Sequence, residues 1–372
     1  MKNIFLFMLV CCIGCTAKKD LSQQPIVFVG TYTKNLGFVD GKASGIYTCR
    51  LDMATGQLTV VDSMLGIANP SFLTVSPDKK YLYAVAENGG SPEQPFGSVV
   101  AYKITEGGKL NKINEVSSYG AAPCHVATDK TGKCVYVSNY STGNVLSYAV
   151  KADGGLTDSI SMHQHKGDSV AWAHQCFQSP DGQYLVSCDK GADKVFVYKY
   201  ESDAKLSPLS NATISMVHGA GPRHSAFNPK NPNLLYIINE NDNTISSVTF
   251  GEKSTINETV STLPADFKGK NTTAEIDVHP NGKFVYGSNR GHNSIVAFQV
   301  NETTGKLSLV GHVSTQGLVP RNFMITPDGS LLLVANQNSD NVVAFFINPA
   351  TGKLTPTGAN NTVMTPVCLK MY

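Results

Sequence analysis

Histidine, arginine and carboxylate residues recur at matching places along this 372-residue sequence. The candidates with polar or charged side chains are His125, Asn139, His174, Asp189, Arg223, His224, Glu240, Glu275, Arg290 and Arg321. Over the whole chain only 16% of the residues are charged, so this grouping is an enrichment. Histidines and carboxylates transfer protons, and a guanidinium presents a planar fork of donors to a carboxylate or phosphate. Together these residues suggest acid–base chemistry on a small anionic molecule.

An internal repeat shows how residues so far apart in the sequence can meet. Seven short strings resemble one another, at residues 45–51, 97–104, 144–150, 194–200, 244–250, 294–300 and 341–347. Measured between their first β-branched residues, the strings recur after 53, 46, 50, 50, 50 and 47 residues. A period of this size is typical of solenoids, propellers and arrays.

Each repeat contains four short segments rich in Val, Ile, Tyr and Phe and bounded by Gly, Pro, Asn or Asp, which is typical of strands. Strings such as Pro180-Asp181-Gly182 separate the first segment from the second. They are predicted to form turns, because Pro presets φ and Gly tolerates the tight bend. Four antiparallel strands that recur about every fifty residues predict propeller blades. The chain has no Trp-Asp dipeptide and a single tryptophan, Trp172, which argues against WD40 and kelch repeats.

The two ends of the chain indicate how the ring closes. The first repeat begins at its second strand, IVFVGTYT from Ile26, and has no first strand of its own. The C-terminal segment PVCLKMY from Pro366 matches the first strands of other repeats, such as PCHVAT from Pro123. We therefore predict an all-β, seven-bladed β-propeller of four-stranded antiparallel blades, in which the C-terminal strand joins the N-terminal blade. This closure leaves no exposed sheet edge at the ends of the ring.

A propeller would bring the candidate residues together. If the first strand of each repeat is innermost, its start and the end of the antiparallel second strand lie on the same face of the ring. The candidates occupy these two places, which predicts a small-molecule site at one mouth of the central channel. A polar rim of paired charges and water is the alternative. His163 and His165 fall outside this set, and we expect both in a solvated loop.

The first fifteen residues differ in composition from the rest of the chain. Lys2 precedes an apolar run from Ile4 to Ile13, which is the pattern of a secretory signal peptide and too short to span a membrane as a helix. The following Gly14-Cys15 is similar to a bacterial lipobox, which predicts cleavage before Cys15 and lipidation of that residue. The predicted organisation is therefore a signal peptide over 1–15, a linker over 16–25 and one propeller domain over 26–372.

This segment also predicts where the protein works. A lipid on Cys15 would attach it to the periplasmic side of a bacterial membrane or to the cell surface. A soluble secreted or periplasmic protein is the alternative, and the location is cytoplasmic if the segment is not a working signal.

Composition narrows the classes of partner. The 30 basic and 28 acidic residues leave a net charge of +2, so no nucleic-acid partner is expected. The cysteines after Cys15 show no Cys-x-x-Cys or paired Cys/His spacing, so we expect no metal site and no cofactor. Their disulfide pairing and the oligomeric state stay open.

Several strings carry a family resemblance: GPRHSAFNP from Gly221, LYIINE from Leu235, VYGSNRGH from Val285, FVGTYT from Phe28 and PVC from Pro366. From about residue 26 to the end, the chain resembles the seven-bladed lactonase family, which includes propeller-type 6-phosphogluconolactonases and fungal 3-carboxy-cis,cis-muconate lactonizing enzymes. The resemblance implies an active site of His174, Arg223, Glu240 and Arg290, all of which are among the channel candidates. The chain departs from the His-Pro-His-like approach common in the phosphogluconolactonase branch, since Trp172-Ala173 precede His174.

The function implied is hydrolysis of a sugar lactone by water without a metal, with a small anionic lactone or sugar acid as substrate. Arg223 and Arg290 would hold the anion and the developing oxyanion, and Glu240 or His174 would transfer the proton. Two arginines lower the pKa of a neighbouring glutamate, which favours His174 as the base. Because 6-phosphogluconolactone is a cytoplasmic metabolite, export implies another substrate or another location. The alternatives are a muconate-type lactonizing isomerase or lyase and a non-catalytic, lipid-anchored binding propeller.

Overall fold

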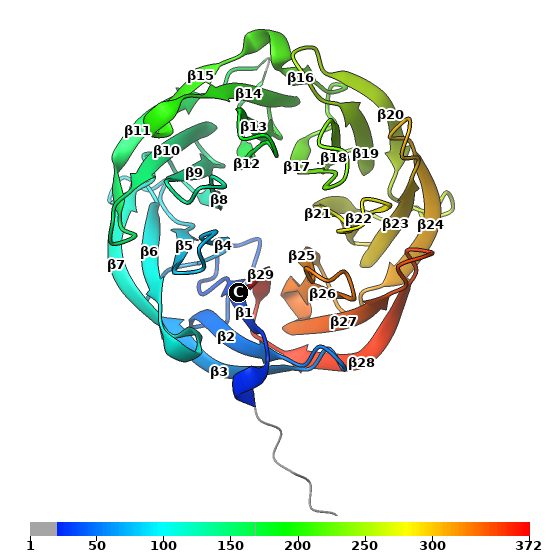
Figure 1. The fold of residues 1–372 in the computed structure, drawn as a ribbon, viewed down its shortest axis with the longest axis horizontal. Coiled ribbons are helices and arrows are strands. Elements are labelled where there is room, and N and C mark those ends of the chain that lie inside the picture. Colours follow the sequence, from blue (N-terminus) through cyan, green and yellow to red (C-terminus); the bar gives the residue numbers. More distant parts are fainter. Residues whose placement is uncertain (1–20, 168) are drawn as a thin grey trace, which may run out of the picture.

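The computed structural model describes residues 21–167 and 169–372, in which seven antiparallel sheets surround a central channel (Figure 1). The predicted signal peptide and lipobox at 1–15 and the first residues of the predicted linker lie outside the described residues. The seven-bladed propeller predicted from the repeat is confirmed, and its strands run from Ile26 to Met371.

The blades follow one another in chain order around the ring. Blade 1 contains β29 (Pro366–Met371), β1 (Ile26–Thr31), β2 (Gly45–Leu51) and β3 (Leu58–Leu65). Blades 2 and 3 contain β4 (Leu73–Val75), β5 (Tyr81–Ala86), β6 (Ser98–Ile104) and β7 (Leu110–Ser117), then β8 (Pro123–Thr128), β9 (Cys134–Asn139), β10 (Asn144–Val150) and β11 (Leu156–Gln164). Blades 4 and 5 contain β12 (Ala173–Gln178), β13 (Tyr184–Asp189), β14 (Lys194–Tyr200), β15 (Leu206–Pro208) and β16 (Ile214–Ser215), then β17 (Pro222–Phe227), β18 (Leu234–Asn239), β19 (Thr244–Thr249) and β20 (Thr255–Ser261).

The remaining elements complete the ring. Blades 6 and 7 contain β21 (Thr272–Val278), β22 (Phe284–Arg290), β23 (Ser294–Val300) and β24 (Leu307–Ser314), then β25 (Pro320–Ile325), β26 (Leu331–Asn336), β27 (Asn341–Ile347) and β28 (Leu354–Thr362). The helical elements of the described residues are 3₁₀ turns, η1 (Leu21–Gln23), η2 (Glu106–Gly108), η3 (Ser202–Ala204), η4 (Ser210–Ala212) and η5 (Gln337–Ser339). None of the helices described is long and apolar enough to cross a membrane.

Closure of the ring occurs where the sequence places it. Strand β29 pairs antiparallel with β1, with Val27 opposite Met371 and Gly30 opposite Cys368. The amide of Tyr372 also donates to the Ile26 carbonyl at 2.9 Å. The last residues of the chain therefore form the innermost strand of the first blade.

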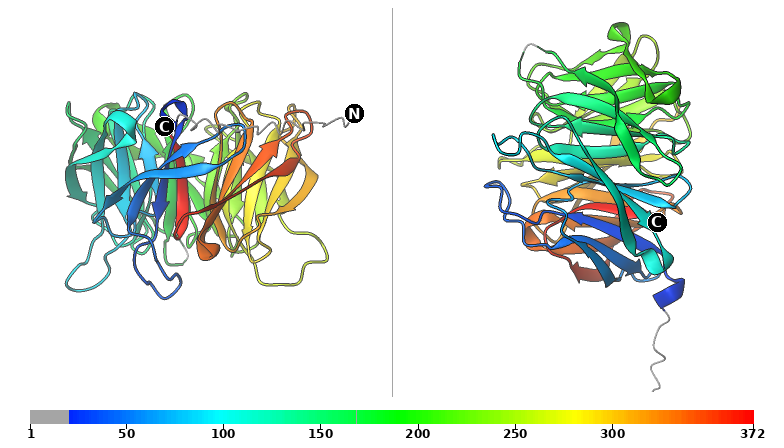
Figure 2. Two further views of the ribbon diagram at one scale, coloured as in Figure 1. Left: turned by 90° about the horizontal axis from the view of Figure 1, so that it is seen from below. Right: turned by 90° about the vertical axis from the view of Figure 1, so that its left-hand side faces the viewer.

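The first two strands of a blade are joined by the turns that the sequence predicts. Their third residue has positive φ, which is +77° at Gly182, +77° at Gly282 and +74° at Gly329. Glycine adopts this conformation without the steric cost that a Cβ brings. These turns gather on one face of the ring, here called the turn face. The opposite face, here called the loop face, carries the longer connections 32–44, 87–97 and 262–271 (Figure 2).

Apolar side chains fill the space between neighbouring blades. One such cluster joins blades 5 and 6 through Tyr236, Ile238, Ile276, Val285 and Phe298, all buried. Hydroxyl groups add contacts from one blade to the next, because Tyr83 donates to the Gly154 carbonyl at 3.1 Å, Tyr286 to the Gly352 carbonyl at 2.9 Å and Ser247 to the Gly305 carbonyl at 2.8 Å. Rigid packing of this kind fixes the inner strands that line the channel.

Blade 4 differs from the four-strand prediction. Its outer strand is divided into β15 and β16, with η4 between them, and both pieces pair with β14. Pro208 ends the first piece, and a proline has no N–H to continue the ladder.

The expectation that His163 and His165 lie in a solvated loop is wrong. His163 belongs to β11, and its Nε2 lies 3.0 Å from the Leu206 carbonyl. His165 is buried, stacks on Phe196 with the ring centroids 4.1 Å apart and pairs with Asp189 at 2.7 Å. Contacts between blades 3 and 4, which local sequence does not reveal, bury the His165 ring and partly bury that of His163.

Candidate active site

A β-bulge at the start of an innermost strand presents consecutive side chains to the channel. In β12 the register moves from Ala173 to Gln175, in β17 from Pro222 to His224, and in β25 from Pro320 to Asn322. The residues left over are His174, Arg223 and Arg321. A bulge breaks the strict alternation of a strand, so Arg223 and the next residue, His224, both make contacts inside the channel.

Glu240 is the centre of an ion cluster at the loop face. Its Oε2 lies 3.0 Å from Arg223 Nε and 3.0 Å from Arg290 Nη2, and its Oε1 accepts a hydrogen bond from Lys190 Nζ at 2.6 Å. Arg223 and Arg290 are also tied to backbone, through Nη1 to the Ala274 carbonyl at 2.8 Å and through Nη2 to the Thr273 carbonyl at 2.5 Å. The cluster is therefore held by residues of blades 4, 5 and 6.

Glu87 is the centre of a second group in the same mouth. It accepts hydrogen bonds from Tyr32 Oη at 2.9 Å and from Ser71 Oγ. Arg321 donates from Nη2 to Tyr32 Oη at 3.0 Å, and its guanidinium lies 5.3 Å from the centroid of the Tyr32 ring. Blades 7, 1 and 2 supply this group, and the three residues around Glu87 are buried or partly buried.

A row of buried side chains lies beside these groups, in contact with one another across the channel. His174 Nδ1 lies 3.2 Å from His224 Nε2, and His224 Nδ1 lies 2.7 Å from Glu275 Oε1. Asn322 Nδ2 donates to the other oxygen of Glu275. His174, His224 and Glu275 are 4%, 1% and 7% exposed, so these contacts form away from bulk water.

The two glutamates of the mouth differ in pKa. Burial alone would raise the pKa of Glu240, but the charges of Arg290, Arg223 and Lys190 outweigh burial and hold it well below its ordinary value. Burial also raises the pKa of Glu87, and there the opposing charge of Arg321 is not enough to reverse the shift. Glu240 is therefore firmly ionised, whereas the charged form of Glu87 is disfavoured relative to that of an exposed glutamate.

The histidines are held in their neutral form. Burial, followed by the charges of Arg223, His224, Arg321 and Lys190, lowers the pKa of His174 well below its ordinary value. Burial lowers the pKa of His224 to about 4 in spite of its contact with Glu275. Both rings therefore carry one proton at neutral pH.

The structure brings most of the predicted residues together. Arg223, Glu240 and Arg290 are in direct contact, and His174 lies in the field of Arg223. The further candidates His224, Glu275 and Arg321 line the same channel. His125 stacks on Phe72 with the centroids 4.2 Å apart, and its Nδ1 accepts from the Cys176 amide at 3.5 Å.

Asn139 and Asp189 lie apart from this group. Asn139 donates to the Ser118 carbonyl at 2.8 Å, and Asp189 accepts from the amides of Trp172 at 2.8 Å, Ala192 at 2.8 Å and Gly191 at 3.0 Å. Successive strand residues point to opposite sides, so the last residue of the second strand faces the blade and the next one faces the channel. Both side chains are fully buried and hydrogen-bonded to backbone groups, so we leave them out of the proposed substrate contacts.

Lys190 is the main channel residue that the sequence analysis missed. It occupies the same repeat position as Glu240 and Arg290, one residue after the position of Asp189. Counting one residue further in that repeat would have found it. Its Nζ lies 5.8 Å from the Trp172 ring and 6.0 Å from the Tyr140 ring, which stack on each other at 5.9 Å. Trp172 is 37% exposed, so it forms an apolar edge beside the ion cluster.

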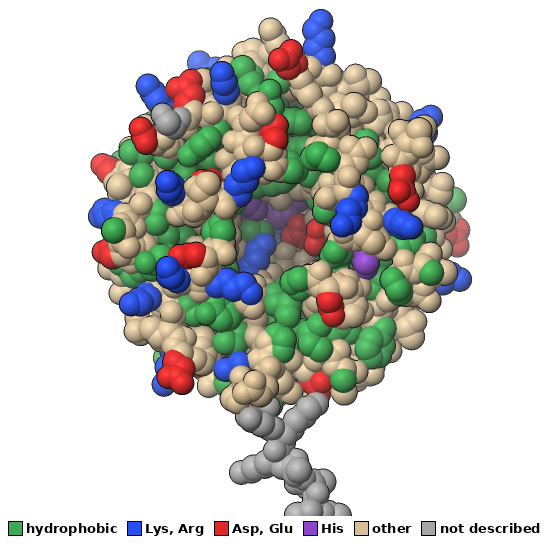
Figure 3. Space-filling model, viewed as in Figure 1, with side chains coloured by type: hydrophobic (Ala, Val, Ile, Leu, Met, Phe, Trp, Pro, Cys, Tyr) green, Lys and Arg blue, Asp and Glu red, His purple; other side chains and the backbone are tan. Residues whose placement is uncertain are grey.

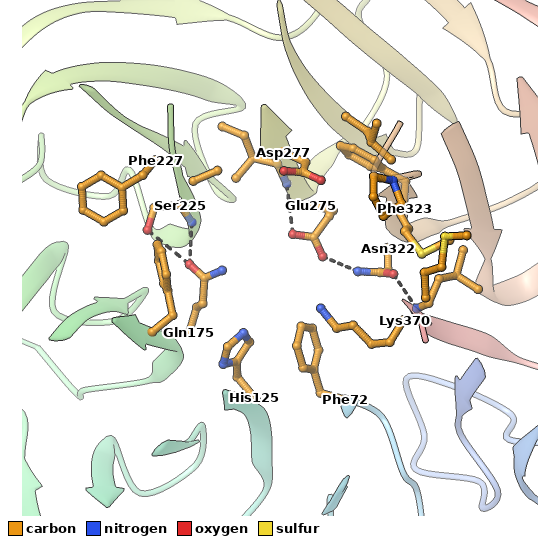
Figure 4. Close-up of a pocket in the computed structure, with 18 of the residues that line it drawn as sticks. Phe72, His125, Gln175, Ser225, Phe227, Glu275, Asp277, Asn322, Phe323 and Lys370 are labelled. Atoms are coloured by element: carbon orange, nitrogen blue, oxygen red, sulfur yellow. Dashed lines mark hydrogen bonds between the residues drawn. The ribbon is translucent and has the colours of Figure 1, made fainter. Parts of the chain in front are cut away.

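The channel is also hollowed from the turn face. A pocket of about 450 Å³ lies there, and Figure 3 shows this opening with histidine and acidic side chains in its depth. His125, Gln175, Glu275 and Asn322 line its inner end, and Lys370 extends between Phe72 and Glu275 (Figure 4). The row of His174, His224 and Glu275 therefore separates the ion cluster of the loop face from this pocket.

The six cysteines in the described part of the chain are buried and free: Cys49, Cys124, Cys134, Cys176, Cys188 and Cys368. Within residues 21–167 and 169–372, no group of three or more His, Cys, Asp or Glu residues is arranged to hold a metal ion.

The chain forms a seven-bladed propeller with a cluster of arginine, lysine, glutamate and histidine side chains at one mouth of its channel. The chain belongs to the seven-bladed β-propeller lactonase family, whose model matches residues 26–371. It is 34% identical to a 6-phosphogluconolactonase of Bacillus subtilis, over 80% of this chain and 84% of that protein. It is 35% identical to a 6-phosphogluconolactonase of Formosa agariphila, over 80% of this chain and 86% of that protein.

A solved structure gives the same relationship. The periplasmic gluconolactonase of Pseudomonas aeruginosa superimposes with a TM-score of 0.86 at 31% identity, over 93% of this chain and 98% of that one. These relatives are named as lactone hydrolases, so the family and the enzyme class predicted from the sequence are confirmed.

Proposed function

We propose that this protein hydrolyses the lactone of an anionic sugar acid at the loop-face mouth of its channel. The observation that carries the proposal is the convergence of Arg223 and Arg290 on Glu240 beside a neutral histidine, His174. Nη2 of Arg223 and Nη1 of Arg290 have no hydrogen-bond partner among the described residues, and neither is among the fully enclosed nitrogens that lack one. These N–H groups are free to donate to a bound oxygen anion.

The reaction that follows from this arrangement conserves atoms and protons. His174 accepts a proton from water as the water oxygen bonds to the lactone carbonyl carbon. Arg223 and Arg290 donate hydrogen bonds to the oxyanion that forms. The bond between the carbonyl carbon and the ring oxygen then breaks, and protonated His174 returns the proton to that ring oxygen. The product is the open hydroxy acid.

His174 rather than Glu240 is the proposed base. Glu240 is ionised but makes contacts with Arg223, Arg290 and Lys190, whose charges hold its pKa too low for proton transfer near neutral pH. The free His174 also has a lowered pKa, in part because it faces Arg223, Arg321 and Lys190. An anionic substrate offsets those charges, which raises the pKa of His174 when the substrate is bound.

The charge of the mouth favours an anion. Lys190, Arg223, Arg290 and Arg321 provide four positive charges, and only two carboxylates, Glu87 and Glu240, are placed among them. The positive charges therefore exceed the negative ones even with both carboxylates ionised. A phosphate or carboxylate on the substrate is complementary to this excess.

Trp172 and Tyr140 supply the apolar part of the proposed binding site. Their stacked rings lie beside Lys190, and the Tyr140 centroid is 5.8 Å from that of His174. A flat, partly exposed aromatic surface beside polar groups can hold the C–H face of a sugar ring while the polar groups orient it.

Hydrolysis assays on purified protein test the proposal. We expect the protein to accelerate acid release from 6-phosphoglucono-1,5-lactone or glucono-1,5-lactone above the spontaneous rate, measured by pH-stat titration. Faster turnover of the phosphorylated lactone would assign an anion site to the excess positive charge. Consumption of a muconolactone alone would support the lactonizing alternative, and ligand binding without consumption of any lactone would support a binding propeller.

We also propose that the chain is exported and lipidated at Cys15. Support comes from the signal-like residues 1–15 and from the periplasmic location named for the Pseudomonas relative. Mass spectrometry of the N-terminal peptide of the mature protein tests this, and we expect a diacylated Cys15 in the membrane fraction. A Cys15→Ala variant that stays with the membrane to the same extent would contradict the proposal.

A further inference from the structure

Three buried side chains form a continuous row from the proposed base to the pocket on the turn face. His174 Nδ1 lies 3.2 Å from His224 Nε2, and His224 Nδ1 lies 2.7 Å from Glu275 Oε1. The three residues belong to β12, β17 and β21, the innermost strands of three successive blades. Each contact joins one blade to the next across the channel.

The position of each proton in this row can be deduced by starting from the Glu275 carboxylate. A carboxylate has no proton to donate, so the nitrogen of His224 that faces Glu275 carries the N–H. A neutral imidazole has a single N–H, so the other nitrogen of His224 is an acceptor. The nitrogen of His174 that faces it, Nδ1, is therefore the donor, and Nε2 of His174 is left with an unshared electron pair.

We propose that His224 and Glu275 are positioning residues that hold the proton of His174 on Nδ1 and so keep Nε2 free as the base toward the mouth. This inference rests on the proposed function, because it assigns His174 its base nitrogen. Nε2 of His174 has no hydrogen-bond partner among the described residues. It is also absent from the enclosed atoms that lack a partner, so it is in contact with the solvent of the channel.

The surroundings of Glu275 keep it ionised. Burial alone would raise its pKa, but His224, Arg223 and Lys370 face it and bring the pKa below its ordinary value. Asn322 donates to one oxygen, and the Ile276 amide donates to the other at 3.2 Å. Figure 4 shows the Glu275 carboxylate beside Asn322, with the Lys370 side chain extending toward it. With the carboxylate ionised, the row has only one proton arrangement that satisfies both contacts.

The surroundings of His224 hold its ring in place. The rings of Phe72 and His125 approach it edge to face, with centroids 5.9 Å and 5.6 Å away and interplanar angles of 81° in both cases. His125 makes no hydrogen bond or ion pair with Glu275 and accepts from the Cys176 amide through its own Nδ1. His125 therefore supports the row by packing and takes no part in its proton order.

Glu275→Gln should reverse the direction of both hydrogen bonds in the row, because the orientation of Asn322 is fixed. Asn322 has a fixed orientation, because its Oδ1 accepts from the Leu369 amide at 2.8 Å. Its Nδ2 donates to one atom of the side chain at position 275, so we expect the amide oxygen of the introduced glutamine to take that place, at the cost of the long 3.2 Å contact from the Ile276 amide to the other atom. The amide nitrogen of the glutamine then faces His224 Nδ1 and donates to it, which moves the His224 proton to Nε2 and the His174 proton from Nδ1 to Nε2.

Nitrogen NMR of the histidines tests the proton order without relying on catalysis. The protein contains nine histidines, and a His174→Gln variant assigns the signals of His174 in a sample labelled with ¹⁵N-histidine. We expect wild-type His174 to be protonated on Nδ1 at pH 7, and E275Q to be protonated on Nε2. A wild-type His174 that carries its proton on Nε2 overturns the inference, even if E275Q fails to fold.

Kinetics provides the second readout, with Asp277→Asn as the matched control. Asp277 is two residues further along β21 and lines the same pocket, but it makes no hydrogen bond or ion pair with either histidine. We expect E275Q to lower kcat by roughly 10²-fold or more, the contribution of a well-placed general base, with KM changed less than about threefold. D277N keeps the wild-type kcat.

The acidic limb of the pH profile adds a readout that loss of packing would not move. His174 faces Arg223, Arg321, Lys190 and His224, and replacing Glu275 removes the negative charge at the far end of the row. We therefore expect the acidic limb of any kcat that remains in E275Q to move to lower pH, because the imidazolium form of His174 is less stabilised and its pKa falls. Equal kcat values for E275Q and D277N would overturn the inference. If the wild-type protein hydrolyses no lactone, the proposed function fails, and the NMR result still decides the proton order.

Discussion

The two carboxylates of the mouth occupy the same position in their repeats and differ in their surroundings. Glu240 and Glu87 each follow the second strand of a blade. Glu240 faces Lys190, Arg223 and Arg290 at 2.6–3.0 Å. Glu87 faces two hydroxyl groups, and the charges of Arg321 and Arg223 act on it without a direct ion pair. Position in the repeat places a carboxylate in the channel, and residues of the neighbouring blades decide the direction in which its pKa shifts.

The largest effect should come from replacing the two carboxylates in turn. Glu240→Gln leaves the buried Arg223 and the partly buried Lys190 and Arg290 without their anion, which should lower the free energy of unfolding at pH 7 by roughly 3–5 kcal/mol. Glu87→Gln should lower it by about 1 kcal/mol or less, because burial disfavours the charged carboxylate there and a Gln keeps an acceptor. Urea unfolding of both variants measures the difference, and equal losses would contradict the comparison.

The pH dependence of these losses should have opposite signs. The pKa of Glu240 is lowered on folding, so its stabilisation is present above the unfolded pKa of about 4.3 and is lost as the pH falls below it. The pKa of Glu87 is raised, so wild type loses stability relative to E87Q as the pH rises through that raised value. Between about pH 4 and 7, the gap to E240Q should grow and the gap to E87Q should shrink.

Replacing an arginine beside Glu240 and one beside Glu87 should separate effects on catalysis from effects on substrate binding. We expect Arg223→Ala to lower kcat by about 10²–10³-fold, equivalent to roughly 2.7–4 kcal/mol, because it removes a preorganised donor to the oxyanion. We expect Arg321→Ala to act mainly on KM, since Arg321 makes contact with Tyr32 and none with Glu240. Steady-state kinetics decides, with the exposed Lys112→Ala as a control for general effects. A larger loss of kcat in R321A than in R223A would contradict the assignment of catalysis to the Glu240 cluster and of binding to the Glu87 group.

Lys190→Met, also in the cluster around Glu240, should have a smaller effect on the kinetic constants. It removes one of three cations from Glu240 and one positive charge from the mouth, while the long apolar side chain keeps the contact with the Trp172 and Tyr140 rings. We expect KM for a phosphorylated lactone to rise roughly tenfold, the scale of one charge-assisted contact. KM for the uncharged lactone should change much less, and equal changes for both substrates would argue against an anion contact.

Trp172→Ala should give the smallest change. The residue is 37% exposed and stacks on Tyr140 at the edge of the mouth. Losing one aromatic face should raise KM by about threefold to tenfold, or roughly 0.5–1.5 kcal/mol, with kcat nearly unchanged. Phe at this position should restore most of the affinity, which distinguishes a stacking role from a structural one.

Sequence alone predicted more of the fold than of the site. The fifty-residue period, the turn residues and the match between the two ends were enough for the number of blades and for the pairing of β29 with β1. The divided outer strand of blade 4 and the burial of His165 were not predictable, because both depend on packing against a neighbouring strand or blade.

In the site, Arg223, Glu240 and Arg290 were predicted and do meet, because their positions in the repeat place them at one mouth. Lys190 was missed, since the prediction placed the residue before it, Asp189, in the channel. The hydrogen-bonded row of His174, His224 and Glu275 was also not foreseen. It depends on a bulge in β12 and β17 that the local sequence does not signal.

The amino-acid sequence by itself determined the strands, their order and the face on which the polar residues lie, because these depend on local patterning and on a repeat that can be counted. The tertiary structure decided in which direction the pKa values of those residues shift and which side chains touch. Burial and the charges of adjacent blades act only after the ring has closed, and they set the pKa values of Glu240, Glu87 and His174.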